Sequence, residues 1–153
     1  MPRTESAIHT LHALAKRACE KAATELAISS DQFAKAKEQV AMLETYRAEY
    51  LAQHVSVLAD GIQSRDLLNF RDFLKNLDQI ILTQQQLVDR TELIVQDKRV
   101  QWQVCERKKL SYQVLTEQEA HRLMIQENKR DQKLTDEFVN TRTAVNSKKK
   151  SMQ

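Results

Sequence analysis

Glycine and proline are almost missing from this sequence. Gly61 is the only glycine and Pro2 the only proline among 153 residues. Hairpin turns, glycine-rich phosphate loops and layered α/β folds need such residues at their turns, so the composition excludes them. Aromatic residues make up only 5% of the chain. What remains is rich in alanine, glutamine, lysine, glutamate and leucine, which favour helices and suit a thin coiled coil with one buried seam.

Long hydrophobic runs and an excess of one charge are also missing. The longest aliphatic run, Ile80-Ile81-Leu82, is far too short to span a membrane, and residues 1–20 lack the apolar stretch of a signal peptide. The net charge is only +3, which does not favour nucleic acid as a partner. The closing run Lys148-Lys149-Lys150 is more typical of a solubilising end than of a binding site.

Gly61 marks the one predicted break in the helical pattern. Glycine adopts the left-handed backbone conformation that ends a helix, because it has no Cβ. Asp60 suits a turn, and Ser64 is a candidate cap for a second helix. We therefore predict an all-α fold, a long antiparallel coiled-coil hairpin. The single domain 1–153 comprises a helix at 4–58, a tip at 59–64, a longer helix at 65–146 and a basic tail at 147–153.

The first helix has an alanine-rich seam, with Thr4 as its predicted cap. The seam begins at Ile8 and Leu11, and two consecutive steps of four after Ala18 predict a stutter at Ala22. Large side chains gather toward the tip, which predicts better packing there. The full predicted seam is Ile8, Leu11, Ala15, Ala18, Ala22, Leu26, Ser29, Phe33, Ala36, Val40, Leu43, Tyr50, His54 and Val57.

The second helix carries a seam with unbroken four-three spacing. Polar residues interrupt it, at a cost in stability that helps to fix the register. Its members are Phe70, Leu74, Leu77, Ile81, Gln84, Val88, Thr91, Val95, Lys98, Trp102, Cys105, Lys109 and Tyr112.

A second apolar series on this helix overlaps the seam. Phe73, Leu77, Ile80, Leu87 and Ile94 form it, and one partner helix cannot cover two adjacent stripes. Part of the series should therefore face solvent. Two interpretations remain open: half-buried flanks of an ordinary coiled coil, or an exposed strip that binds another protein.

The two predicted helices differ in length. Antiparallel pairing about the tip places Ile8 near Val114 and Leu115, and Cys19 near Cys105. Residues beyond about 120 have no partner within the hairpin, although Leu134 and similar residues continue the helical pattern. This overhang should fray in isolation.

No pattern predicts catalysis, a cofactor or a metal. His9 and His12 form a solvated pair without a nearby ligand, His54 is a packed or hydrogen-bonded seam residue, and His121 is exposed. Cys19 and Cys105 lack a CxxC context and are predicted to be reduced structural thiols, as in a cytoplasmic protein.

Three segments resemble the flagellar type III export protein family FliJ. The first is residues 38–50, EQVAMLETYRAEY. The second comprises Gly61-Ile62 and residues 69–80, NFRDFLKNLDQI. The third and most specific is residues 127–138, ENKRDQKLTDEF. Together these segments span most of the chain.

The resemblance implies a cytoplasmic coiled coil, peripheral at the inner face of the cell membrane, that acts as a stalk in flagellar biosynthesis. Such a stalk would stand in the ring of the export ATPase FliI, contact the cytoplasmic region of the export gate FlhA and cycle export chaperones. It would have no transmembrane segment, nucleic acid, cofactor or bond chemistry of its own. The implied gate contact is Phe73, Leu77, Ile80 and Gln84, and the ring candidates are Arg130, Asp131, Lys133, Asp136, Glu137 and Phe138.

Other hypotheses about the function remain open. One is a generic coiled-coil chaperone or scaffold, or the stalk of a related injectisome. Another is a nucleic-acid clamp that uses the basic tail, whose affinity would fall steeply with salt.

Overall fold

Two long helices account for the fold. The structure, a computed structural model, describes residues 2–61 and 64–152. Helix α1 runs over Pro2–Ala59 and helix α2 over Ser64–Ser151, with 58 and 88 residues. No strand occurs within these described ranges. The predicted all-α hairpin with a longer second helix is confirmed.

The helix ends differ slightly from those expected. Because α1 begins at Pro2, Thr4 lies inside the helix and is not its cap; a proline suits the first helical position, where no N–H is needed. Helix α2 continues through Lys148–Lys150, which were expected to form a separate tail. Lysines in a last turn interact favourably with the carbonyl end of the helix dipole. The expected cap Ser64 and seam member Val57 lie outside the residues whose side chains are described.

Gly61 lies between the two helices, as predicted. Its φ of +81° is the only positive φ among the described residues. A Cβ built there would meet nothing within 4 Å. The requirement for glycine therefore comes from the backbone conformation and not from lack of space.

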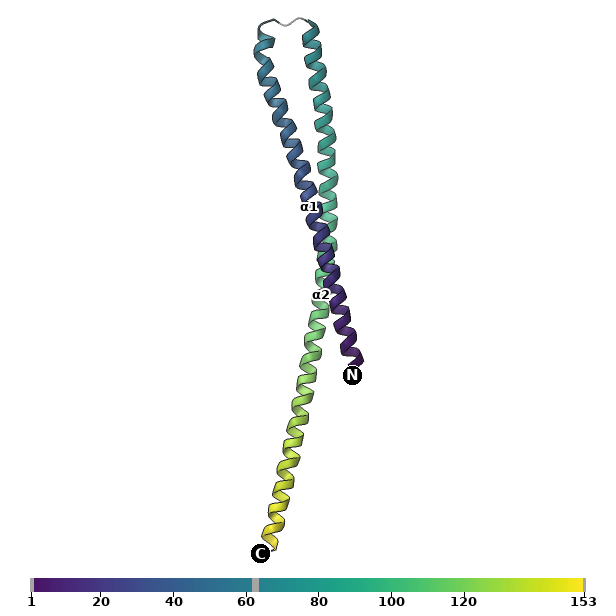
Figure 1. Cartoon of the computed structure of the whole chain (residues 1–153), viewed down its shortest axis with the longest axis vertical. Coiled ribbons are helices and arrows are strands. Elements are labelled where there is room, and N and C mark those ends of the chain that lie inside the picture. The colour runs from purple at the N-terminus through teal and green to yellow at the C-terminus, as the bar shows by residue number, and fades with distance from the viewer. Residues whose placement is uncertain (1, 62–63, 153) are drawn as a thin grey trace. The chain divides into compact units, whose positions relative to one another are not determined.

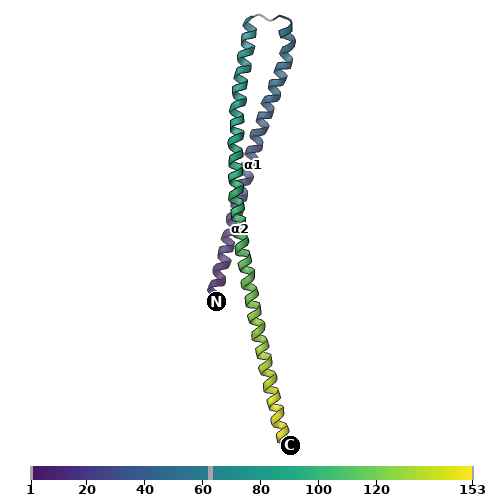
Figure 2. The same cartoon turned by 180° about the vertical axis from the view of Figure 1, so that it is seen from behind.

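The chain divides into two units. One contains residues 17–106; the other contains the residues up to Lys16 and those from Arg107 onward. In residues 17–106, α1 and α2 run antiparallel on either side of Gly61 (Figure 1), and the same arrangement is seen from behind (Figure 2). The prediction of a single domain stays a prediction.

The seam of residues 17–106 has its centre in the middle of the paired helices. Ala36, Val40 and Val88 form a buried cluster, with Phe33 packed against it. Met42 and Tyr46, closer to the tip, are 64% and 51% exposed. These two side chains lie beside the seam rather than in it, and the prediction that the tip end packs better stays a prediction.

The seam of α2 follows the predicted residues, each of which is buried or half-buried. The seam of α1 differs from the prediction at three places. Leu11 and Ala18 are exposed, whereas His12 is half-buried and Cys19 is 3% exposed, and Arg47, which the predicted seam skipped, is half-buried. With His12, Cys19 and Arg47 the spacing alternates between three and four without a slip. The predicted stutter at Ala22 is therefore wrong.

In the other unit, the start of α1 lies opposite residues of α2 that are about two positions beyond the expected ones. Ile8 shares a pocket with Thr116 and Ala120, while Val114 and Leu115 are 43% and 46% exposed. From residue 124 to residue 152 every side chain is exposed. This agrees with the prediction that the later part of α2 has no partner within the hairpin.

Candidate functional site

An aromatic cluster joins the two helices near Gly61. The Tyr50 ring of α1 lies 5.5 Å from the Phe70 ring and 4.3 Å from the Phe73 ring of α2, between centroids. Tyr46 approaches Phe73 edge-on at 6.5 Å. His54 packs at 4.0 Å from Tyr50 and 5.6 Å from Phe70. Such ring pairs add stability beyond the apolar area that they bury.

His54 is held by a hydrogen bond as well as by packing. Its Nδ1 lies 2.8 Å from the backbone oxygen of Tyr50. A carbonyl oxygen only accepts hydrogen bonds, so Nδ1 carries the proton that is donated. The prediction of a packed or hydrogen-bonded imidazole at this position is confirmed.

The four residues of the expected gate contact divide into two pairs. Phe73 and Ile80 are 36% and 50% exposed, whereas Leu77 is 5% exposed and Gln84 is half-buried. Leu77 and Gln84 occupy seam positions that face α1, so Leu77 belongs to the core and not to the exposed strip. The prediction that part of the second apolar series faces solvent is confirmed.

Sequence reasoning did not find that α1 contributes to this strip. Tyr46, at 51% exposure, lies against the exposed Phe73. The signal for this neighbour was the four-residue spacing of Tyr46 and Tyr50, which places both rings on one side of a helix.

An ion pair crosses between the helices nearby. The Nε atom of Arg47 donates a hydrogen bond of 2.6 Å to Oδ1 of Asp78. Arg47 is a half-buried member of the seam, at the position that the predicted seam skipped. A second pair, Lys98 Nζ to Glu25 Oε2 at 3.4 Å, crosses the seam farther from Gly61. Both pairs join residues of opposite helices.

The six residues expected to contact the ring of the export ATPase lie on the exposed part of α2. Phe138 is 68% exposed, and Leu134 beside it is 59% exposed. Arg130 lines a shallow pocket with Leu123, Gln126 and Glu127. The segment thus presents charges of both signs together with large apolar side chains. All of Arg130, Asp131, Lys133, Asp136, Glu137 and Phe138 are exposed.

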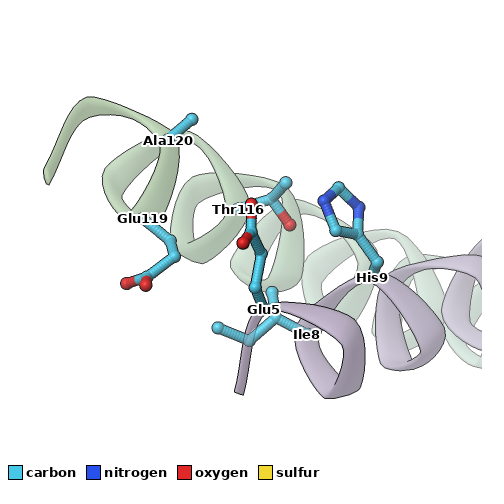
Figure 3. A pocket seen from close by; sticks show the side chains of 6 residues that line it. All are labelled: Glu5, Ile8, His9, Thr116, Glu119 and Ala120. Atoms are coloured by element: carbon cyan, nitrogen blue, oxygen red, sulfur yellow. The ribbon is translucent and has the colours of Figure 1, made fainter. Parts of the chain in front are cut away.

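A small pocket lies where the start of α1 meets α2. It is lined by Glu5, Ile8 and His9 of α1 and by Thr116, Glu119 and Ala120 of α2 (Figure 3). Its volume is about 60 Å³, which suits a few waters and not a substrate. It combines apolar groups with hydroxyl, carboxylate and imidazole groups.

Glu119 is ion-paired to Arg122 at the edge of this pocket. The Nη2 atom of Arg122 lies 2.6 Å from Oε1 of Glu119, and Nε lies 3.2 Å from Oε2. These hydrogen bonds, with the guanidinium charge, lower the pKa of Glu119 and raise the pKa of Arg122.

The remaining candidate chemistry is sparse. Within residues 2–61 and 64–152, no cluster of three or more histidine, cysteine or acidic residues could hold a metal. His9 and His121 are exposed, as expected for both, but His12 is half-buried in the seam and so does not form a solvated pair with His9. Neither Cys19 nor Cys105 forms a disulfide. Over the same residues, neither helix has a stretch both long and apolar enough to cross a bilayer.

The fold and these surfaces define a class: helical hairpins with exposed apolar and charged surfaces. The family model for the flagellar FliJ protein matches residues 4–148. The chain belongs to the FliJ family, and it is therefore a component of the flagellar export apparatus.

Curated relatives agree with this assignment. The chain is 30% identical over 133 residues to the flagellar FliJ protein of Escherichia coli (strain K12), and 27% identical over 137 residues to that of Salmonella typhi. Each alignment covers 87% of this chain and 90% of the relative. No solved structure matches the chain with significant similarity.

Proposed function

We propose that this protein is a non-enzymatic stalk of the flagellar export apparatus that couples the export ATPase FliI to the export gate FlhA. The observation that carries the proposal is that one helix, α2, bears two different exposed surfaces. One is the apolar strip beside Gly61 with Phe73 and Ile80. The other is the unpaired segment from residue 124 to residue 152.

The gate contact uses Phe73 and Ile80 directly. Phe73 is held by Tyr46 and Tyr50, so its ring is ordered before binding and loses little freedom on contact. Leu77 and Gln84 contribute indirectly, because they lie in the seam under the strip and set the distance between the two helices there. Tyr46 extends the same apolar area onto α1.

The proposed contact with the FliI ring uses the exposed part of α2. Its mixed charges suit a partner surface that is also charged, while Phe138 supplies an apolar anchor. A rim of exposed charges contributes mainly to encounter rate and specificity, which fits a contact that has to form and break. In this account the protein works in the cytoplasm, peripheral to the inner face of the membrane, and also cycles export chaperones.

Stimulation of the ATPase tests the ring contact. The variant Arg130→Glu/Lys133→Glu should lose the ability to raise FliI turnover, and Phe138→Ala should reduce it. Lys148→Glu/Lys149→Glu is the matched control, since it makes the same change in net charge on the same helix outside the proposed contact. Equal loss in both double variants, or no stimulation by the unaltered protein, contradicts the stalk role.

A further inference from the structure

One flank of the seam in residues 17–106 is apolar well beyond the proposed gate contact. The residues that immediately precede four seam positions of α2 are Phe73, Ile80, Leu87 and Ile94, which are 36%, 50%, 38% and 47% exposed. They repeat every seven residues, so the row extends roughly 30 Å along the helix. The proposed gate contact takes up only its first half.

A groove occupies the second half of this flank. Its apolar floor includes Ala36 and Leu87, and its volume is about 480 Å³. Ile28, 54% exposed, and Met42, 64% exposed, continue the apolar surface of α1 on either side, because each lies three or four residues from a glutamine that lines the groove. The full lining is Gln32, Lys35, Ala36, Gln39, Gln84, Leu87 and Thr91.

The other flank of the seam has a different character. The residues that immediately follow seam positions there include Asp78, Glu92, Arg99, Lys37 and Glu44, all of them exposed. Charged residues at both flanks are usual for a solvated two-helix coiled coil. Leu82 and Val55, 53% and 58% exposed, also follow seam positions there, but they form no seven-residue repeat. The continuous apolar row is therefore a property of one flank of the seam.

The edge of the groove is basic on both helices. Lys35 lines the groove on α1. Arg90 follows Leu87 by three residues and precedes Ile94 by four, so it lies on the same side of α2. Lys35 also forms an exposed pair with Asp31 at 3.0 Å, a contact that is cheap to exchange for another carboxylate.

We propose that an acidic amphipathic helix of a partner protein docks in this groove as a third helix. A seven-residue repeat of apolar side chains matches a helix with three-four spacing and not a strand, whose side chains repeat every two residues. The partner's apolar residues pack between Gln39 and Leu87, and its carboxylates face Lys35 and Arg90. The groove shares Gln84 with the proposed gate contact, but Phe73 and Ile80 lie outside its lining.

Designed peptides test this proposal on the full-length protein by fluorescence anisotropy. One helical peptide of about 24 residues carries leucines at three-four spacing flanked by glutamates, and a second carries lysines in place of the glutamates. The first should bind more tightly. Lys35→Glu/Arg90→Glu should weaken its binding roughly tenfold and reverse the preference, since two exposed pairs each become repulsive.

Control variants distinguish binding at this site from non-specific binding. Lys37→Glu/Arg99→Glu makes the same charge change on the other flank and should leave the preference intact. Leu87→Gln should weaken binding, whereas Leu93→Gln, at a residue 65% exposed on another side of α2, should not. The charge variants change only exposed residues, so they keep the test valid even if Leu87→Gln disturbs the fold.

Three outcomes overturn the proposal. The peptides bind equally well, or the control charge variant loses as much as the test variant. Alternatively, the protein alone sediments as a dimer that Leu87→Gln dissociates, in which case a second copy of this chain covers the groove.

Discussion

The ring of Tyr50 on α1 lies 4.3 Å from the ring of Phe73 on α2, centroid to centroid, with the two planes inclined at 40°. This contact covers one part of the Phe73 ring and leaves 36% of the residue exposed. Leu77, one turn farther along α2, is almost completely covered. Adjacent members of one apolar series thus have different roles.

Truncation of these two residues should affect stability unequally. Leu77→Ala removes a buried seam side chain and should lower the free energy of unfolding by about 2–4 kcal/mol. Phe73→Ala removes a partly exposed ring and should cost only about 1 kcal/mol. Urea unfolding followed by circular dichroism at 222 nm measures both. Equal losses would mean that Phe73 is as much part of the core as Leu77.

Substitution of Gly61 should destabilise the hairpin through the backbone alone. Gly61→Ala places a Cβ on a residue with φ of +81° and should cost about 1–2 kcal/mol, although nothing obstructs the Cβ itself. Gly61→Asn should cost less, because asparagine tolerates this conformation better. Thermal unfolding that is identical for all three proteins would show that the left-handed conformation is not required.

The ion pair between Arg47 and Asp78 should contribute only modestly to the stability of the hairpin. Their side chains are 37% and 53% exposed, so solvent screening limits the coupling to about 0.2–1 kcal/mol despite the short contact. A double-mutant cycle with Arg47→Met and Asp78→Asn measures this coupling, which should decrease as salt is added. A coupling that does not change with salt would contradict an exposed ion pair.

The pair Glu119 and Arg122 should make the helix sensitive to acid. Hydrogen bonding to Arg122 lowers the pKa of Glu119 from its ordinary value of 4.5, so the stabilisation is present above pH 4.5 and is lost as the pH falls through the lower folded value. Nuclear magnetic resonance titration of the Glu119 carboxyl carbon reports this pKa directly. Arg122→Gln should return it toward 4.5, and an unchanged titration in that variant would show that Arg122 is not the cause.

The register of the seam predicts that Cys19 and Cys105 lie at one level. Ala36 and Val88, which pack together, are related by the same antiparallel numbering. The neighbouring Ala15 and Ala22 allow close approach of the helices. Mild oxidation should therefore produce an intramolecular disulfide, detected as faster migration on a non-reducing gel and absent in Cys105→Ser. Only intermolecular products would contradict this register.

Much of the fold could be predicted from the sequence, because one glycine in a helix-forming chain leaves few alternatives. The α2 seam was predictable throughout, since large side chains such as Phe70, Val88 and Val95 repeat at regular spacing. The α1 register near Leu11 and Ala18 was not. Alanines bury little area wherever they lie, so the partner helix decided that His12 and Cys19 would face inward.

The candidate sites were less predictable than the fold. The pattern showed a surplus apolar strip but could not separate buried Leu77 from exposed Phe73, because both fit a helical stripe. The contribution of Tyr46 depended on α1 geometry. The assignment of this strip to an export gate, and of the segment around Phe138 to an ATPase ring, came from family resemblance and not from physical pattern.

The most direct test of the account is the affinity of the cytoplasmic region of FlhA for this protein and two variants, measured by calorimetry. Phe73→Ala/Ile80→Ala should lose binding at least tenfold while keeping its helical circular dichroism spectrum. Leu82→Ala/Leu93→Ala, which truncates two exposed leucines elsewhere on α2, should bind like the unaltered protein. Full binding by Phe73→Ala/Ile80→Ala, or equal loss in both variants, would contradict the gate contact on which the stalk account depends.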